Sequence, residues 1–189
     1  MIYVTQGHEK GIGLEIFLKS FLLLSGEEKS QVVLVADRKV VEQNLFDLNL
    51  SKTSFKDLQL VTPPVDAALP SSTQTLTHTL NIITKDDILV TLPTSKDQLI
   101  YNGKNMAGYT EFFRSYYHNA NIAMTFRGIS QNVLLITDHV ALKDVTKTIT
   151  KDLIVEKTKT TIEFYKKYFS TIDEIVFSGI NPHVGENEF

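Results

Sequence analysis

The stretch that most constrains the fold lies at the N-terminus, where residues 2–24 read IYVTQGHEKGIGLEIFLKSFLLL. Its first four residues are apolar or β-branched and predict a strand. Residues 14–24 are rich in Leu and Phe and predict a largely apolar helix, which we expect to be well buried. Between them, glycines at positions 7, 11 and 13 predict a tight loop. A strand that passes through a glycine-rich loop into a helix is typical of an α/β fold.

Strand-like and helix-like segments alternate along the rest of the chain. Strands are predicted at residues 2–5, 31–36, 58–61, 87–93, 121–127, 132–137 and 173–179, and helices at 14–24, 38–48, 73–84, 108–118 and 149–169. The runs at 31–36 and 87–93 are continuously apolar, as expected for buried strands of a parallel sheet. Asp37 is the expected N-cap of the second helix. The polar segment at 93–107, with its Gly and Asn turn signals, is the best candidate for a boundary between two lobes.

Composition narrows the classes of function. Of the 189 residues 42% are hydrophobic and 22% charged, which is ordinary for a soluble globular chain. The net charge of -3 and the lack of a Lys/Arg block argue against a nucleic-acid partner. The chain has no cysteine, so disulfides and thiolate metal sites are excluded. The apolar run at 14–24 is too short to span a bilayer, and no signal-peptide pattern precedes it, so we expect a cytoplasmic protein without a membrane partner.

Two histidines follow predicted strands. His139 comes after the strand at 132–137 and directly after Asp138, and His183 comes after the strand at 173–179. Either histidine taken alone is more often a structural group than a ligand. Two imidazoles at two strand ends could nevertheless converge on one divalent metal. A catalytic metal site normally has three protein ligands, and His8 in the glycine loop is the least easily dismissed of the other histidines.

Three further features could bind an anion. The glycine loop leads into a helix N-terminus, although the spacing of its glycines fits neither the dinucleotide fingerprint nor the P-loop. Lys96, after the strand at 87–93, could hold a phosphate or a carboxylate, and a solvated surface lysine is the alternative. Thr110, in the first turn of the helix at 108–118, could cap that helix or bind an anion.

Four segments match, in order, the motifs of one family. Residues 7–15 read GHEKGIGLE where the family has GDPAGIGPE, and residues 108–112 read GYTEF where it has GHTEF. Residues 137–144 read TDHVALKD against TTHLPLRD, and residues 179–186 read GINPHVGE against GLNPHAGE. Together they resemble the 4-hydroxythreonine-4-phosphate dehydrogenases of vitamin B6 (pyridoxal phosphate) biosynthesis. The last motif is the most specific, and the resemblance covers almost the whole chain.

The resemblance implies a three-layer α/β/α fold like that of the isocitrate and isopropylmalate dehydrogenases, with two lobes around a cleft. We place the first lobe at 1–95 and the second, with the dimer interface and the metal-site histidines, at 96–189. The implied chemistry is NAD-dependent oxidation of a phosphorylated hydroxy acid, followed by decarboxylation. A divalent metal (Zn, Mg or Co) would assist as a Lewis acid. The family's sites are shared between two subunits, which implies a homodimer.

The resemblance also implies roles for particular residues. His139 and His183 match two of the three histidines that hold the metal in the family. Tyr109 and Thr110 fall in the motif that contacts the substrate, and Lys96 is the catalytic candidate at the cleft. Residues that bind NAD are not identified.

The chain departs from the family at its site motifs. Tyr109 replaces the motif histidine, Leu92 stands where glycine before proline is usual, and the loop at 7–15 lacks the family's acid and prolines. The family's chains continue past this segment through a third metal histidine, so we expect these residues to be the N-terminal part of a longer enzyme. A catalytically degenerate binding or dimerisation protein and an inactive fragment are the alternatives.

Overall fold

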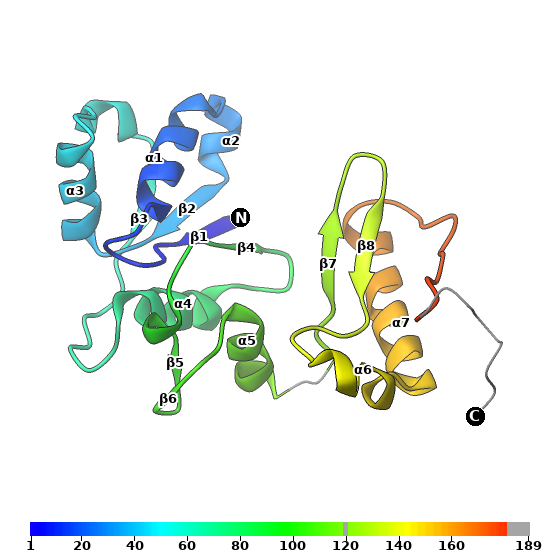
Figure 1. The fold of residues 1–189 in the computed structure, drawn as a ribbon. Coiled ribbons are helices and arrows are strands. Elements are labelled where there is room, and N and C mark those ends of the chain that lie inside the picture. Colours follow the sequence, from blue (N-terminus) through cyan, green and yellow to red (C-terminus); the bar gives the residue numbers. More distant parts are fainter. Residues whose placement is uncertain (119–120, 181–189) are drawn as a thin grey trace. The chain divides into compact units, whose positions relative to one another are not determined.

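The computed structural model describes residues 1–118 and 121–180 and shows an α/β protein (Figure 1). The chain forms two compact units, Met1–Tyr117 and His118–Phe189. No helix in residues 1–118 or 121–180 is long and apolar enough to cross a lipid bilayer. The expected α/β class with a parallel sheet is confirmed.

A four-stranded parallel sheet forms the centre of the first unit. Its strands are β1 (Ile2–Thr5), β2 (Val32–Val35), β3 (Gln59–Val61) and β4 (Ile88–Thr91), in the order β3-β2-β1-β4. Ile2 of β1 pairs with Val32 on one side and Ile88 on the other. Every residue of β2 is buried, as its continuous apolar run predicts. All four strands were expected from the sequence.

The strand β4 differs from expectation because it is not fully buried. Ile88 is 56% exposed and Val90 is 40% exposed, while the residues between and after them are partly covered. Leu89 packs against a buried cluster that includes Leu76 and Leu80, whereas Ile88 and Val90 lie on the opposite face of this edge strand and stay exposed there. An apolar run predicts a strand, but it does not say whether a second strand or a helix covers each side.

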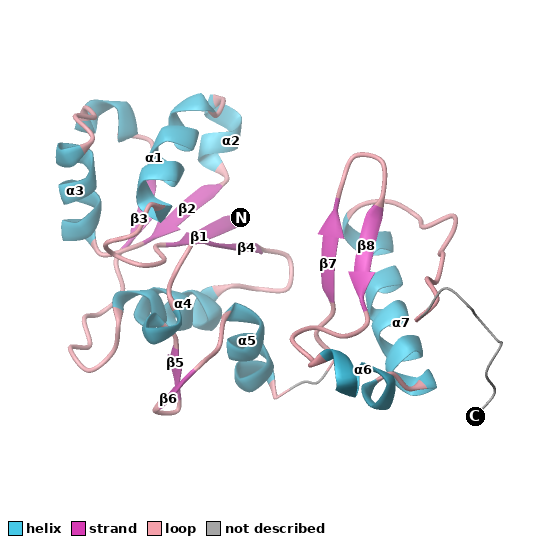
Figure 2. Ribbon diagram, viewed as in Figure 1, coloured by secondary structure: helices cyan, strands magenta, loops and turns pink. Residues whose placement is uncertain are grey.

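Helices cover both faces of this sheet, which makes the first unit three-layered. They are α1 (Gly13–Leu23), α2 (Gly26–Ser30), α3 (Arg38–Asp47), α4 (Ser71–Ile82) and α5 (Tyr109–Tyr117), with a short 3-10 helix η1 (Lys52–Phe55). Figure 2 shows α1 and α3 on one side of the sheet and α4 on the other. Asp37 caps α3 as expected, since its side chain accepts a hydrogen bond from the Lys39 backbone N–H at 2.7 Å.

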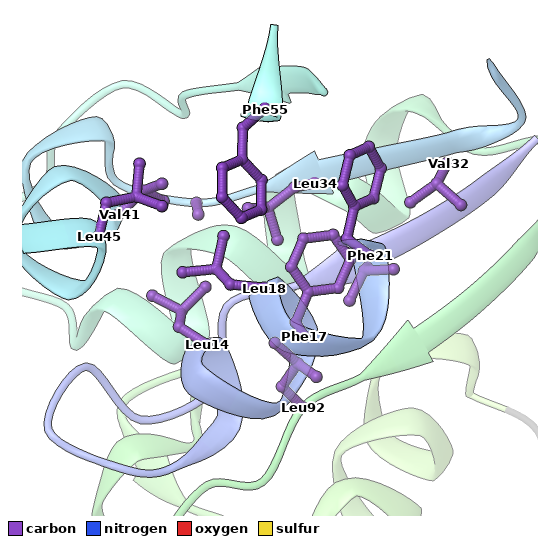
Figure 3. Close-up of a cluster of buried hydrophobic side chains, with 12 residues drawn as sticks. Leu14, Phe17, Leu18, Phe21, Val32, Leu34, Val41, Leu45, Phe55 and Leu92 are labelled. Atoms are coloured by element: carbon purple, nitrogen blue, oxygen red, sulfur yellow. The ribbon is translucent and has the colours of Figure 1, made fainter. Parts of the chain in front are cut away.

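The larger core cluster lies between the sheet, α1 and α3. Figure 3 shows its aromatic centre, where the Phe21 ring lies 5.8 Å from that of Phe17 and 6.0 Å from that of Phe55. Leu18 and Leu34, which pack beside them, are completely buried. Helix α1 is therefore buried along one face, while its Leu23 at the C-terminal end is exposed.

A second core cluster packs residues 96–117 against α4, so this segment belongs to the first unit. The segment contains the 3-10 helix η2 (Lys96–Gln98) and the short antiparallel strands β5 (Ile100–Tyr101) and β6 (Lys104–Asn105). Leu99, Met106 and Phe112 are buried against α4. The structure therefore divides the chain after Tyr117 and not at 95/96, because these apolar side chains anchor the expected boundary loop. Assignment of the dimer interface to residues 96–189 stays a prediction.

The second unit begins with a hairpin. Its elements are β7 (Met124–Arg127), β8 (Asn132–Leu135), α6 (Leu142–Thr148) and α7 (Lys151–Tyr168). The strands β7 and β8 pair antiparallel, because the connection between them is too short for a parallel crossover. Thr150 caps α7, its hydroxyl accepting from the Leu153 backbone N–H at 3.2 Å.

The strand predicted at 173–179 is wrong for this structure. Residues 171–180 are described and form neither strand nor helix. Val176 and Phe177 are 80% and 60% exposed. An apolar run makes a segment suitable for a sheet, but a strand forms only where a neighbour completes its hydrogen bonds.

Candidate functional site

Ligands of α/β proteins bind near the carboxyl ends of the parallel strands. In the first unit, Gln6 connects the elements that meet there. Gln6 follows β1 directly and is completely buried. Its Oε1 accepts from the Asp37 backbone N–H at 2.8 Å, and its Nε2 donates to Ser71 Oγ at 3.1 Å. One side chain thus links the end of β1 to the starts of α3 and α4. Gln6 is not among the residues predicted from the sequence, although a polar residue between a buried strand and a glycine is a signal for such a role.

The glycine loop is pressed against the end of β4. Gly7 has φ +72°, and a Cβ there would lie 2.4 Å from the Pro93 carbonyl oxygen and 2.8 Å from that of Leu92. The His8 backbone N–H donates to Pro93 O at 3.0 Å. A Cβ on Gly13 would lie 3.0 Å from Leu92 Cβ. Close packing against the end of β4 therefore accounts for Gly7 and Gly13 without a ligand.

His8 is engaged within its own loop. Its Nδ1 accepts a hydrogen bond from the Lys10 backbone N–H at 2.9 Å, and its carbonyl accepts from the Gly11 N–H at 3.0 Å. One imidazole nitrogen thus stabilises the turn, which leaves Nε2 as the nitrogen that could act on a ligand.

Tyr109 contacts the same segment at the end of β4. Its hydroxyl donates to the Leu92 carbonyl oxygen at 2.6 Å, and its ring stacks on Phe113 with centroids 6.3 Å apart. Burial raises the pKa of Tyr109 to about 12, an effect that the Thr91 hydroxyl partly offsets. Tyr109 is therefore a neutral hydrogen-bond donor at ordinary pH. Its contact with Leu92 could not be predicted from the sequence.

The raised pKa of Tyr109 predicts a pH dependence of stability. The unfolded phenol ionises near pH 10, while the folded one stays neutral to about pH 12, so the stabilisation is complete below pH 10 and is lost between these values. We expect Tyr109→Phe to remove one late phenolate step from the ultraviolet absorbance titration and to flatten the loss of stability in that window. Tyr3→Phe is the control. A late step that persists in Tyr109→Phe would contradict the assignment.

Lys96 and Thr110 lie in the same unit with different surroundings. Lys96 is the first residue of η2 and is exposed. This exposure is compatible both with a solvated lysine and with a lysine that binds a ligand. Thr110 is half-buried in the first turn of α5. The Glu111 carboxylate accepts from the Ala107 backbone N–H just before that helix. Glu111 therefore stabilises the start of α5, the role for which the sequence suggests Thr110.

A cavity of about 530 Å³ lies near the carboxyl ends of the strands. It is lined by the loop that follows β3 and by the first turns of α4. Glu9, Asp37 and Asp66 contribute three carboxyl groups to its lining. Gln74 holds the loop, accepting from the Asp66 N–H at 2.9 Å and donating to Leu69 O at 2.6 Å. Three carboxylates disfavour a phosphate, so this cavity, which the sequence did not indicate, is not a suitable phosphate site.

His139 lies in the second unit, in the turn between β8 and α6. Its side chain is exposed and its φ is +55°. The side chain before it, Asp138, is buried next to Lys157, with 3.7 Å between Oδ1 and Nζ. His183 lies outside the described residues. Among residues 1–118 and 121–180, no group of three His, Asp or Glu side chains is arranged to hold a metal ion.

One protein family and several of its curated members match this chain. The family model described as "Pyridoxal phosphate biosynthetic protein PdxA" matches residues 28–189. A 4-hydroxythreonine-4-phosphate dehydrogenase of Sulfurihydrogenibium sp. is 28% identical over 97% of this chain and 64% of its own length. One from Hydrogenobaculum sp. is 29% identical with the same coverage, 97% and 64%. The chain thus spans about 64% of the length of these curated relatives.

Solved structures support the same fold. The crystal structure of a 4-hydroxythreonine-4-phosphate dehydrogenase from Burkholderia phymatum has a TM-score of 0.74 at 19% identity, over 98% of this chain and 64% of that one. At this identity the likeness concerns the fold alone. The family match covers most of the sequence, including the segments around Tyr109 and His139. The chain therefore belongs to the PdxA family of pyridoxal phosphate biosynthetic proteins.

Proposed function

We propose that the protein is an NAD-dependent and divalent-metal-dependent dehydrogenase of pyridoxal phosphate biosynthesis, acting on a phosphorylated hydroxy acid such as 4-hydroxythreonine 4-phosphate. The observation that carries the proposal is the PdxA family match over residues 28–189. Relatives named 4-hydroxythreonine-4-phosphate dehydrogenase support it. In this reaction the secondary alcohol gives a hydride to NAD and a proton to a base, and the β-keto acid then loses carbon dioxide.

Several of the described residues have roles in this proposal. His139 is suited to a metal because its imidazole is exposed at a strand end, and imidazole is a ligand for Zn and Co. The described residues contain no complete group of three ligands, so His183 and further donors are needed. The metal would polarise the substrate oxygen as a Lewis acid. Lys96 would be the catalytic residue, and Tyr109 and Thr110 would bind the substrate. The protein would act as a homodimer.

The test is made on the protein as its native cell produces it, with its intact mass compared first with 21.3 kDa. We expect NADH to form from NAD and 4-hydroxythreonine 4-phosphate when Zn²⁺, Mg²⁺ or Co²⁺ is present, and chelation to stop it. His139→Ala should abolish NADH formation and weaken metal binding, because one ligand is lost. His78→Ala, in the middle of α4, should retain both.

A second candidate function is binding of a phosphorylated ligand without catalysis. Tyr109 favours it, because a phenol replaces the imidazole of the family motif and is engaged with the Leu92 carbonyl. Ligand binding without NADH formation under any of these metals would support this candidate. Absence of both binding and NADH formation would contradict the two proposals together.

A further inference from the structure

A buried ion pair lies beside the candidate metal ligand in the second unit. Lys157 Nζ, on α7, lies 3.7 Å from Asp138 Oδ1, in the turn after β8, and both side chains are only 5% exposed. Lysine and aspartate are almost never buried to this extent unless they are paired. The pair thus joins the β8–α6 turn to the longest helix of its unit.

Stability alone does not explain this pair. Burying two charges costs free energy that their attraction often only offsets, and neutral side chains of similar size are frequently as stable. A buried pair that is not needed for stability can instead select one local geometry.

The ion pair lies next to His139, whose backbone conformation it can fix. This histidine is the next residue in the chain, and its φ of +55° is uncommon for a residue with a side chain. Such a conformation persists only where the surrounding structure holds it. Helix α6, which follows the turn, has no side-chain cap at Ala141, whereas α7 is capped by Thr150. The contact with α7 therefore gives the turn a fixed support.

We propose that Asp138 and Lys157 are positioning residues, which hold the turn so that the His139 imidazole is presented in one orientation. The benefit to catalysis rests on the proposed function, because it requires His139 to bind a metal. The effect on the turn itself does not depend on any metal.

Four variants test the proposal in the protein as it exists. Asp138→Asn and Lys157→Met each remove one charge of the buried pair, and the double variant removes both. Lys159→Met is the matched control, since Lys159 is an exposed lysine on the same helix. Amide hydrogen exchange is measured for residues 137–140 and compared with β7 in the same sample. Zn²⁺ affinity is measured in parallel by calorimetry.

We expect each single variant to lower the unfolding midpoint and to speed exchange in the turn at least about tenfold relative to β7. The double variant should recover the midpoint, because both buried charges are removed together. Its turn should still exchange faster than that of the unsubstituted protein. Zn²⁺ affinity should fall about tenfold in all three variants and stay unchanged in Lys159→Met.

If exchange in the turn follows β7 in every variant, or if the double variant recovers turn protection together with stability, the pair is structural only and the proposal is wrong. If single variants fail to fold, the double variant decides. If the protein binds no Zn²⁺, the metal part of the proposed function fails, while the exchange ratios still decide whether the pair positions the turn.

Discussion

Replacing Gly7 with alanine is expected to lower the free energy of unfolding by about 3 kcal/mol, the sum of backbone strain and overpacking. The new Cβ would lie 2.4 Å from Pro93 O in a backbone with φ +72°, so the two strand ends would have to separate. Neighbouring Gln6 would be displaced as well. We expect a lower midpoint in urea unfolding followed by circular dichroism, with faster amide exchange in β1 and β4.

Substitutions at two other glycines distinguish the contribution of backbone strain from that of overpacking. Gly103 has φ +73° with no atom within 4 Å of an added Cβ, so Gly103→Ala measures strain alone, about 1 kcal/mol. Gly26, at the start of α2, has neither strain nor a close neighbour, so Gly26→Ala should be neutral or slightly stabilising. If Gly7→Ala costs no more than Gly103→Ala, the packing of the loop against β4 is not what requires a glycine.

Another large effect is expected in the core between the sheet and α1. Phe21→Ala should cost about 3–5 kcal/mol, because a fully buried aromatic side chain leaves a cavity between elements that cannot close around it. Phe21 is 1% exposed, and its ring contacts those of Phe17 and Phe55. We expect the unfolding midpoint of the first unit to fall accordingly.

Phe46→Ala is the matched control for that loss. Phe46 lies on α3 of the same unit and is 80% exposed, so its removal should change the free energy of unfolding by no more than about 0.5 kcal/mol. Equal losses for Phe21→Ala and Phe46→Ala would show that the packing around α1 is not the main source of stability.

Local sequence was sufficient for the four strands of the parallel sheet and for α1, α3, α4 and α5, although it did not predict α2, β5 or β6. The apolar runs located β1, β2 and β3, and the Leu/Phe-rich stretch after Gly13 located α1. The N-cap at Asp37 was also correct, since capping uses atoms only two residues apart. Periodicity and caps are properties of neighbouring residues, so the sequence carries them directly.

Residues 93–107 and 173–179 show where local pattern fails. The composition of 93–107 is that of a polar linker, yet this segment packs through Leu99 and Met106. The apolar run at 175–177 is typical of a strand, yet residues 173–179 form none in the described structure. In each case the outcome depends on which distant element supplies a partner surface. For the same reason, Ile88 and Val90 are exposed in a strand that was expected to be buried.

The sequence by itself determined the α/β class, the four strands of the parallel sheet and the motifs that resemble the family. Only the tertiary structure showed that Gln6 joins three elements, that the Tyr109 hydroxyl donates to Leu92, and that Asp138 is paired with Lys157. These contacts join residues far apart in the chain. Their energies come from burial and hydrogen bonding between elements, which no spacing within a single element records.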